Sequence, residues 1–163
     1  MALNAYLACN GDIRGDILGS CTQAGREDRM EIYGWSHEVA SPRDAASGLP
    51  TGKRQHKPFT ITKAVDKASP LLMGALVDNE NIGTWKLECW RPARSGKEEQ
   101  NFTVELFNAN VASIRQEQLN NKYAENMPIE VREHVAFTYQ KIIWTWMDGG
   151  IQAEDDWETP TVV

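Results

Sequence analysis

Short runs of alternating apolar and polar residues cover most of this chain. The first run places Leu3, Ala5, Leu7 and Cys9 at every second position. Successive side chains of a strand point to opposite faces, so this period of two predicts a strand. We predict further strands where the period returns, at residues 12–19, 29–39, 59–65, 84–91, 102–111 and 129–146.

The run at residues 29–39 is apolar on both of its faces. Met30 and Ile32 lie on one face, and Tyr33 and Trp35 lie on the other. Strands of this kind are usually covered on both sides. We therefore expect the protein core on one side of this strand and a second layer, such as a partner subunit, on the other.

The period changes once along the chain, at Ser69 and Pro70. A serine side chain can cap free N–H groups at a helix start, and proline at the first helical position has no N–H to lose. Leucine and alanine residues follow at helical spacing, so we predict one short α-helix at about Ser69–Asn79. Many strands and one helix predict a mainly β fold, a tight antiparallel β-barrel or sandwich, in a single domain over residues 1–163.

A long segment without periodicity, at about Ala40–Gln55, separates two of the predicted strands. It contains two prolines and two glycines, which predicts an extended loop. A loop of this length in a compact domain is usually functional or disordered. Two interpretations are open from the residues, a flexible surface insertion and an arm that lies on a neighbouring subunit.

The charge balance argues against several classes of function. The 17 basic and 23 acidic residues give a net charge of −6, whereas a nucleic-acid surface needs clustered Lys and Arg. No apolar run approaches the roughly 20 residues of a membrane span, so we expect no membrane insertion. The N-terminal segment has no basic residues before its short apolar run, so we expect no cleavable signal peptide and folding in the cytoplasm.

The residues show no pattern typical of catalysis, and we predict no enzyme activity, no cofactor and no metal. No serine stands in a nucleophile elbow, and the glycine-rich stretches lack phosphate-loop spacing. The three histidines lie far apart, without metal-ligand spacing: His37, His56 and His134. The three cysteines form no CxxC pair, and Cys9 and Cys89 lie in apolar runs, where we expect buried, unreactive thiols.

Two adjacent segments resemble a known family. Lys57–Lys63 reads KPFTITK and Val65–Leu72 reads VDKASPLL. With most of the remaining chain, up to Trp157, they resemble the haemolysin-coregulated protein (Hcp) family, the tube proteins of bacterial type VI secretion. The resemblance implies a structural subunit of hexameric rings that stack into a hollow tube. It also implies the partners: further copies of the chain, a VgrG spike, the contractile sheath, and small effector proteins carried and stabilised in the lumen.

The resemblance further implies where the assembly surfaces lie. The strand around Trp35 and Ser36 would face the lumen and its cargo. Such a protein is cytoplasmic while the tube is assembled, and sheath contraction then secretes it without a cleavable signal. The long loop would contact neighbouring subunits or rings through Pro42, Arg43, Asp44, Leu49, Lys53, Arg54 and His56.

Two alternatives to the type VI tube remain open at this point. A phage-like tail-tube protein has the same architecture and would also form rings. A monomeric β-barrel that binds a small ligand or a peptide would instead have the mass of one copy in solution. The six tryptophans fit each alternative, because tryptophan serves both in cores and at interfaces.

Overall fold

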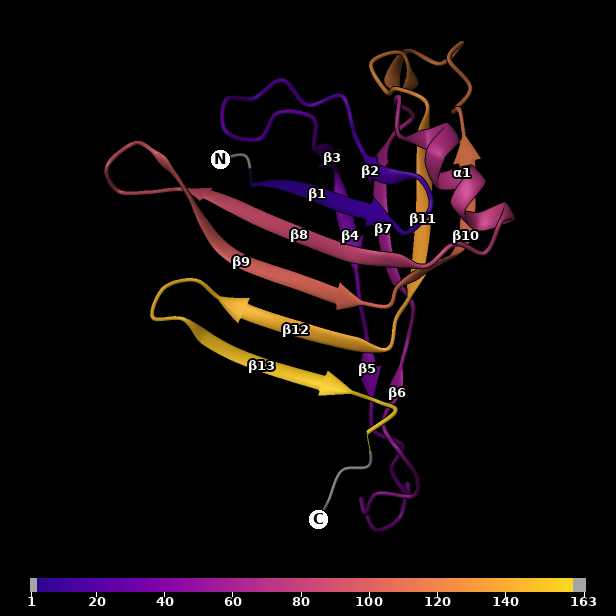
Figure 1. The fold of residues 1–163 in the computed structure, drawn as a ribbon, viewed down its shortest axis with the longest axis vertical. Helices are drawn as coiled ribbons and strands as arrows, with labels where there is room; N and C mark the ends of the chain where they lie inside the picture. The colour runs from indigo at the N-terminus through magenta and orange to yellow at the C-terminus, as the bar shows by residue number, and fades with distance from the viewer. Residues whose placement is uncertain (1–2, 160–163) are drawn as a thin grey trace.

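The computed structural model describes residues 3–159 and shows a body of two antiparallel sheets, whose strands cross at a steep angle (Figure 1). The predicted mainly β fold with antiparallel sheets and one α-helix is confirmed. Within the described residues the strand pairings form separate sheets, and no pairing closes them into one barrel.

The larger sheet has seven strands. β3 (Met30–Ile32) pairs with β1 (Asn4–Gly11) beside β2 (Gly15–Ile17). The edge strand β13 (Ile151–Asp156) of this larger sheet lies in an acidic segment without apolar alternation, so the sequence pattern did not predict it. The other six strands have the spatial order β13 (Ile151–Asp156), β12 (Lys141–Trp146), β9 (Glu98–Phe107), β8 (Ile82–Pro92), β1 (Asn4–Gly11) and β2 (Gly15–Ile17).

The smaller sheet has four strands and packs across the larger one. A separate two-stranded ribbon joins β5 (Val39–Ala40) to β6 (Gln55–His56). A 3-10 turn, η1 (Ala124–Asn126), lies in the connection between β10 (Asn110–Glu117) and β11 (Arg132–Thr138). The four strands of the smaller sheet have the spatial order β10 (Asn110–Glu117), β11 (Arg132–Thr138), β7 (Phe59–Ala64) and β4 (Gly34–Ser36).

Three runs that were predicted as single strands each cross from one sheet to the other. The corners lie at Tyr33 between β3 and β4, at Asn108 between β9 and β10, and at Gln140 between β11 and β12. Asn108 has a left-handed φ of 50°, which asparagine adopts more readily than most residues. Strands that switch sheets in this way form the corners of crossed β-packings.

The core lies between the two sheets. Phe59 and Ile61 on β7 and Leu87 on β8 are fully buried, and Trp85 is almost fully buried. The Trp85 ring packs edge-on against Phe59, at 5.0 Å between ring centroids, and against Phe137 at 5.5 Å. Aromatic rings prefer this edge-to-face arrangement, which fixes the packing of the two sheets.

The predicted helix is confirmed as α1 (Ser69–Val77), which contacts β10 and ends two residues earlier than expected. Pro70 occupies the first turn, as predicted. The capping role of Ser69 was wrong, because Ala68 is the N-cap residue and makes no side-chain cap. The Ser69 hydroxyl instead donates to Glu133 Oε1 at 2.7 Å and accepts from the Asp66 N–H at 2.9 Å.

Candidate functional site

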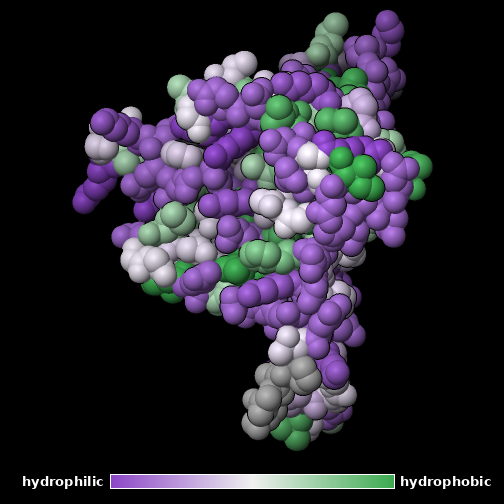
Figure 2. All heavy atoms as spheres, in the orientation of Figure 1, coloured by the Kyte–Doolittle hydropathy of each residue, from purple (hydrophilic) through white to green (hydrophobic). Residues whose placement is uncertain are grey.

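The most distinctive feature of the molecule is an arm, residues 38–57, that projects from the body (Figures 1 and 2). Its base is the β5–β6 ribbon, in which Val39 pairs with His56 and Ala40 pairs with Gln55. The Lys57 N–H donates to the Glu38 carbonyl at 3.0 Å and extends this ladder toward the body. The segment that was predicted as an extended loop therefore begins and ends as a paired ribbon.

The tip of the arm is folded by its own hydrogen bonds. Asp44 Oδ2 accepts from the Ser47 hydroxyl at 2.6 Å and from the Ser47 N–H at 2.8 Å, and these bonds hold the pKa of Asp44 below its usual value. The Asp44 N–H donates to the Leu49 carbonyl at 2.9 Å, and the Thr51 N–H donates to the Pro42 carbonyl at 3.0 Å. An ordered tip that leaves the Leu49 side chain exposed can present an apolar contact to another molecule.

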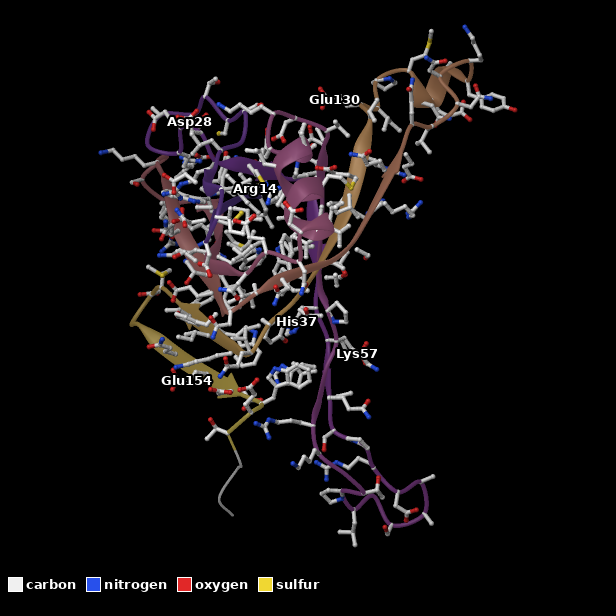
Figure 3. The ribbon with its side chains drawn as sticks, turned by 45° about the vertical axis from the view of Figure 1, so that its right-hand side comes forward. Arg14, Asp28, His37, Lys57, Glu130 and Glu154 are labelled. Atoms are coloured by element: carbon white, nitrogen blue, oxygen red, sulfur yellow. The ribbon has the colours of Figure 1, made fainter. Side chains whose placement is uncertain are left out.

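Side chains from distant parts of the sequence fasten the arm to the body. Arg54 Nη2 donates to Asp155 Oδ1 at 2.7 Å, and Arg54 Nε also bonds to the same carboxylate. His56 Nε2 lies 2.7 Å from Asp155 Oδ2, and His56 Nδ1 lies 2.8 Å from the Tyr139 hydroxyl. His37 Nε2 reaches that hydroxyl from the other side at 2.6 Å, and Figure 3 shows His37 where the arm leaves the body.

The electrostatics of this fastening follow from its partners. The hydrogen bond from Arg54, and then that from His56, hold the pKa of Asp155 below its usual value. Burial raises the pKa of the Tyr139 hydroxyl, so Tyr139 stays protonated at neutral pH. Burial, and to a lesser extent the charge of a protonated His56, lowers the pKa of His37. At neutral pH the cluster therefore holds an ionised carboxylate and a neutral His37.

A second surface feature is an apolar hollow of about 410 Å³ beside β4. Trp35 and Trp146 line it, with 40% and 38% of their surface exposed. The Trp35 ring stacks on Phe59 at 5.4 Å and faces Phe102 at 6.3 Å. An aromatic wall of this kind offers contact area at little entropic cost, which suits a binding surface.

The predicted site residues fall into separate groups. Arg54 and His56 bond within their own chain at the arm base, whereas Trp35 and the exposed Ser36 lie on β4, just before the arm begins. The sequence pattern around the arm did not indicate Tyr139 or Asp155, because they lie 83 and 99 positions from His56. The remaining predicted contact residues lie toward the tip: Pro42, Arg43, Asp44, Leu49 and Lys53.

Two searches of the described residues bear on other kinds of site. Among residues 3–159, His, Cys, Asp and Glu side chains nowhere gather in groups of three or more that could hold a metal ion. The same part of the chain contains no helix with the length and apolar character needed to cross a membrane.

The fold and the arm define an antiparallel two-sheet protein with a projecting ribbon. The family model for "Type VI secretion system effector, Hcp" matches residues 6–146. The chain belongs to this Hcp family, which confirms the resemblance read from the sequence.

Similar proteins extend over nearly the whole chain. The "Major exported protein" of Pseudomonas aeruginosa is 38% identical over 169 residues, which cover 98% of each chain. A crystal structure of an Hcp protein superposes with a TM-score of 0.91 at 32% identity, covering 98% of this chain and 100% of that one. The structure of the secreted protein Hcp3 from Pseudomonas aeruginosa gives a TM-score of 0.80 at 31% identity, with 97% and 100% covered.

Proposed function

We propose that this chain is the tube subunit of a type VI secretion system. It assembles into hexameric rings, the rings stack into a hollow tube, and contraction of the sheath exports the tube behind a VgrG spike. The observation that carries the proposal is an arm of ordered structure that projects from an Hcp-family body and exposes Leu49 at its tip. An ordered projection loses little entropy when it binds, so it is suited to recurrent contacts between subunits.

Ring formation sets requirements that the surface can meet. Each subunit must use one surface to bind a different surface of the next subunit, with a rotation that closes the ring. A stable contact of this kind buries about 800 Å² on each partner. The arm tip and the exposed Trp146 at the end of β12 supply two different apolar surfaces for such contacts.

The names of two similar proteins support export. One is called a major exported protein and another a secreted protein. We infer that this chain is likewise secreted and that its role involves no catalytic step. Its role is then mechanical, and the tube carries small effector proteins as cargo in its lumen.

Shortening the arm tests the role of its tip. Replacing residues 44–49 with Asn-Gly joins the bridge partners Arg43 and Pro50 by a favoured two-residue turn and keeps the anchors Arg54 and His56. We expect native mass spectrometry to show intact rings and electron microscopy to show fewer stacked tubes than for the parent. Arg94→Ala, an exposed change in the β8–β9 turn, is the control and should behave as the parent.

The outcomes of this experiment separate the parts of the proposal. A parent protein with the mass of a single copy at cellular concentration would contradict the ring, and would favour a monomeric binding protein. Rings and tubes of the shortened variant that match the parent would contradict the role of the tip.

The cargo surface has its own test. We propose that Trp35 and Ser36 face the lumen, because both are exposed on β4. Ser36→Arg should reduce the amount of effector that co-purifies with the ring while the ring mass stays unchanged. Ser95→Arg places the same side chain in the exposed β8–β9 turn and should retain effector at the parent level. Unchanged retention by Ser36→Arg would contradict the assignment.

A further inference from the structure

Four side chains at the arm base form one continuous chain of hydrogen bonds. The links are His37 Nε2 to the Tyr139 hydroxyl at 2.6 Å, Tyr139 to His56 Nδ1 at 2.8 Å, and His56 Nε2 to Asp155 Oδ2 at 2.7 Å. Tyr139 is buried, and only 1% of the His56 side chain is exposed. The chain joins both ends of the arm to the body, because His37 precedes β5 and His56 ends β6.

With both histidines neutral, the available protons allow the three hydrogen bonds to run in only one direction, from donor to acceptor, along the cluster. An ionised Asp155 can only accept, so His56 must carry its proton on Nε2 and donate to it. His56 Nδ1 then accepts the hydroxyl proton of Tyr139. The Tyr139 oxygen in turn accepts from the Nε2–H of His37. All three links are satisfied, and each donor points toward the Asp155 carboxylate.

One added proton reverses part of the chain without breaking it. A protonated His56 donates from both nitrogens, to Asp155 and to the Tyr139 oxygen. The Tyr139 hydroxyl rotates and donates to His37 Nε2, while neutral His37 moves its own proton to Nδ1. Asp155, which is also paired with Arg54, offsets the charge of His56.

A second proton cannot be accommodated in the same way. With His37 also protonated, ring N–H groups of both histidines point at the Tyr139 oxygen, and the hydroxyl proton loses its acceptor within the chain. Two cations would then flank one buried oxygen. The aromatic rings packed around His37 belong to Phe59, Tyr139 and Trp144, none of which is charged at neutral pH.

The other groups that face the cluster do not relieve this conflict. Trp157 packs against His56 at 5.7 Å between ring centroids, and its Nε1 donates to the Tyr139 carbonyl at 2.6 Å. Asp156 presents its backbone carbonyl to Arg54, and its side chain lies 3.5 Å from Gln140 Nε2. The nearest carboxylate, Asp155, is already bonded to Arg54 and to His56. A second imidazolium therefore has no partner carboxylate among the groups that contact it.

We propose that the His37–Tyr139–His56–Asp155 chain is an acid-sensitive latch that fastens the arm, tolerates one proton and opens on the second. Opening frees both ends of the ribbon from Tyr139 while Arg54 still bonds to Asp155, so the arm gains freedom without detaching from the fold. Because the arm carries the contacts of the proposed tube, acid would weaken ring stacking; that consequence alone rests on the proposed function.

Amide hydrogen exchange of the full chain tests the latch directly. Exchange in the arm, residues 41–54, is followed by mass spectrometry from about pH 8 to about pH 4.5 and corrected for the intrinsic pH dependence. We expect arm protection to fall about tenfold or more once the pH drops below the ordinary histidine pKa of about 6.5. Arm protection in the parent that stays constant over this range would overturn the proposal.

Three variants define which groups form the latch. His37→Gln keeps an N–H donor for Tyr139 but cannot gain a proton, so the arm should stay protected in acid. Tyr139→Phe removes the shared oxygen and should leave the arm open at every pH. His134→Gln is the control, because His134 bonds to Thr62 and Glu117 outside the cluster, and it should retain the parent profile. An acid transition that persists in His37→Gln, or is lost in His134→Gln, would overturn the proposal.

Nitrogen-15 NMR of the histidine rings gives a readout that needs no unfolding or assembly. Addition of one proton to the cluster should be accompanied by a change of His37 from the Nε2–H to the Nδ1–H tautomer. A His37 that keeps the Nε2–H tautomer until it becomes charged would contradict the latch. Both measurements report on the subunit, so a negative result leaves the tube proposal intact, and a single-copy mass would leave the latch intact.

Discussion

Lys63 Nζ lies 2.6 Å from Glu133 Oε1, and the side chains of both residues are completely buried. The two are register partners on β7 and β11 of the smaller sheet. Lys63 Nζ also donates to Asp66 Oδ1 at 2.8 Å and to Ser69 Oγ at 3.2 Å, and Gln116 donates to Glu133 Oε2 at 3.0 Å. The pair thus joins the start of α1 to the sheet, and each charge has several partners.

Breaking this pair on one side should be costly. Glu133→Gln leaves the Lys63 ammonium buried without its main counter-charge, and we expect a loss of about 3–5 kcal/mol in the free energy of unfolding. Urea denaturation at fixed protein concentration measures it. Asp28→Asn is the control, because it breaks the exposed Lys67–Asp28 pair at 3.0 Å and should cost less than about 1 kcal/mol. Equal losses in the two variants would contradict the role given to the buried pair.

The sequence predicted Lys63 on the same strand face as Phe59 and Ile61, and the structure buries all three. It did not predict the partner, because Glu133 lies in another run and pairing across a sheet leaves no local pattern. For the same reason, the sequence of the arm did not predict its contacts with Tyr139 and Asp155. Local rules such as the helix start at Pro70 succeeded, since their cause lies within a few residues.

The corners between the sheets show a different limit of the sequence pattern. Apolar residues recur on both sides of Tyr33, Asn108 and Gln140, with a slip of phase at Phe107, because the strands on both sides of each corner contribute side chains to the same core. The pattern therefore reports that a residue faces the core but not which sheet carries it. β13 was missed for the opposite reason, since its side chains are mostly exposed and it is held by its ladder with β12.

One close approach of backbones makes a glycine necessary. A Cβ on Gly19 would lie 2.5 Å from the Arg29 carbonyl oxygen and 2.6 Å from the Met30 Cα, so the chain before β3 would have to move. We expect Gly19→Ala to lower stability by about 1–3 kcal/mol, as overpacking does. Gly34→Ala is the matched control, because no atom lies within 4 Å of its Cβ position. A thermal melt that falls equally in both variants would contradict the argument.

The buried thiol of Cys9 should resist modification. Burial raises the pKa of Cys9 to about 12, and the thiolate is the reactive form. We expect a maleimide reagent at about pH 7 to label the half-buried Cys21 in the native protein well before Cys9. Labelling of all three cysteines in urea is the control for access. Mass spectrometry of the peptides measures the order in which the cysteines are labelled. Fast labelling of Cys9 in the native protein would contradict the prediction and would show that β1 opens.

Acid should weaken the junction of β10 and β11 through Glu117. Arg132 Nε donates to Glu117 Oε1 at 2.7 Å and His134 Nε2 lies 3.2 Å away, and these partners lower the pKa of Glu117 to about 2. A carboxylate whose pKa is lower in the folded state binds fewer protons there than in the unfolded chain. Its contribution to stability is therefore complete above the ordinary value of 4.5 and is lost as the pH falls toward about 2.

Glu117→Gln tests this dependence. The variant should be less stable than the parent at about pH 6, and the difference should shrink as the pH falls from about 4.5 toward about 2, because the parent loses the same interaction by protonation. Urea unfolding at a series of pH values measures how the free energy of unfolding of the variant and of the parent depends on pH. Glu158→Gln, at an exposed position near the end of the described chain, should follow the parent curve throughout. A gap between Glu117→Gln and the parent that stays constant down to about pH 2.5 would mean that the ion pairs of Glu117 do not set the acid response.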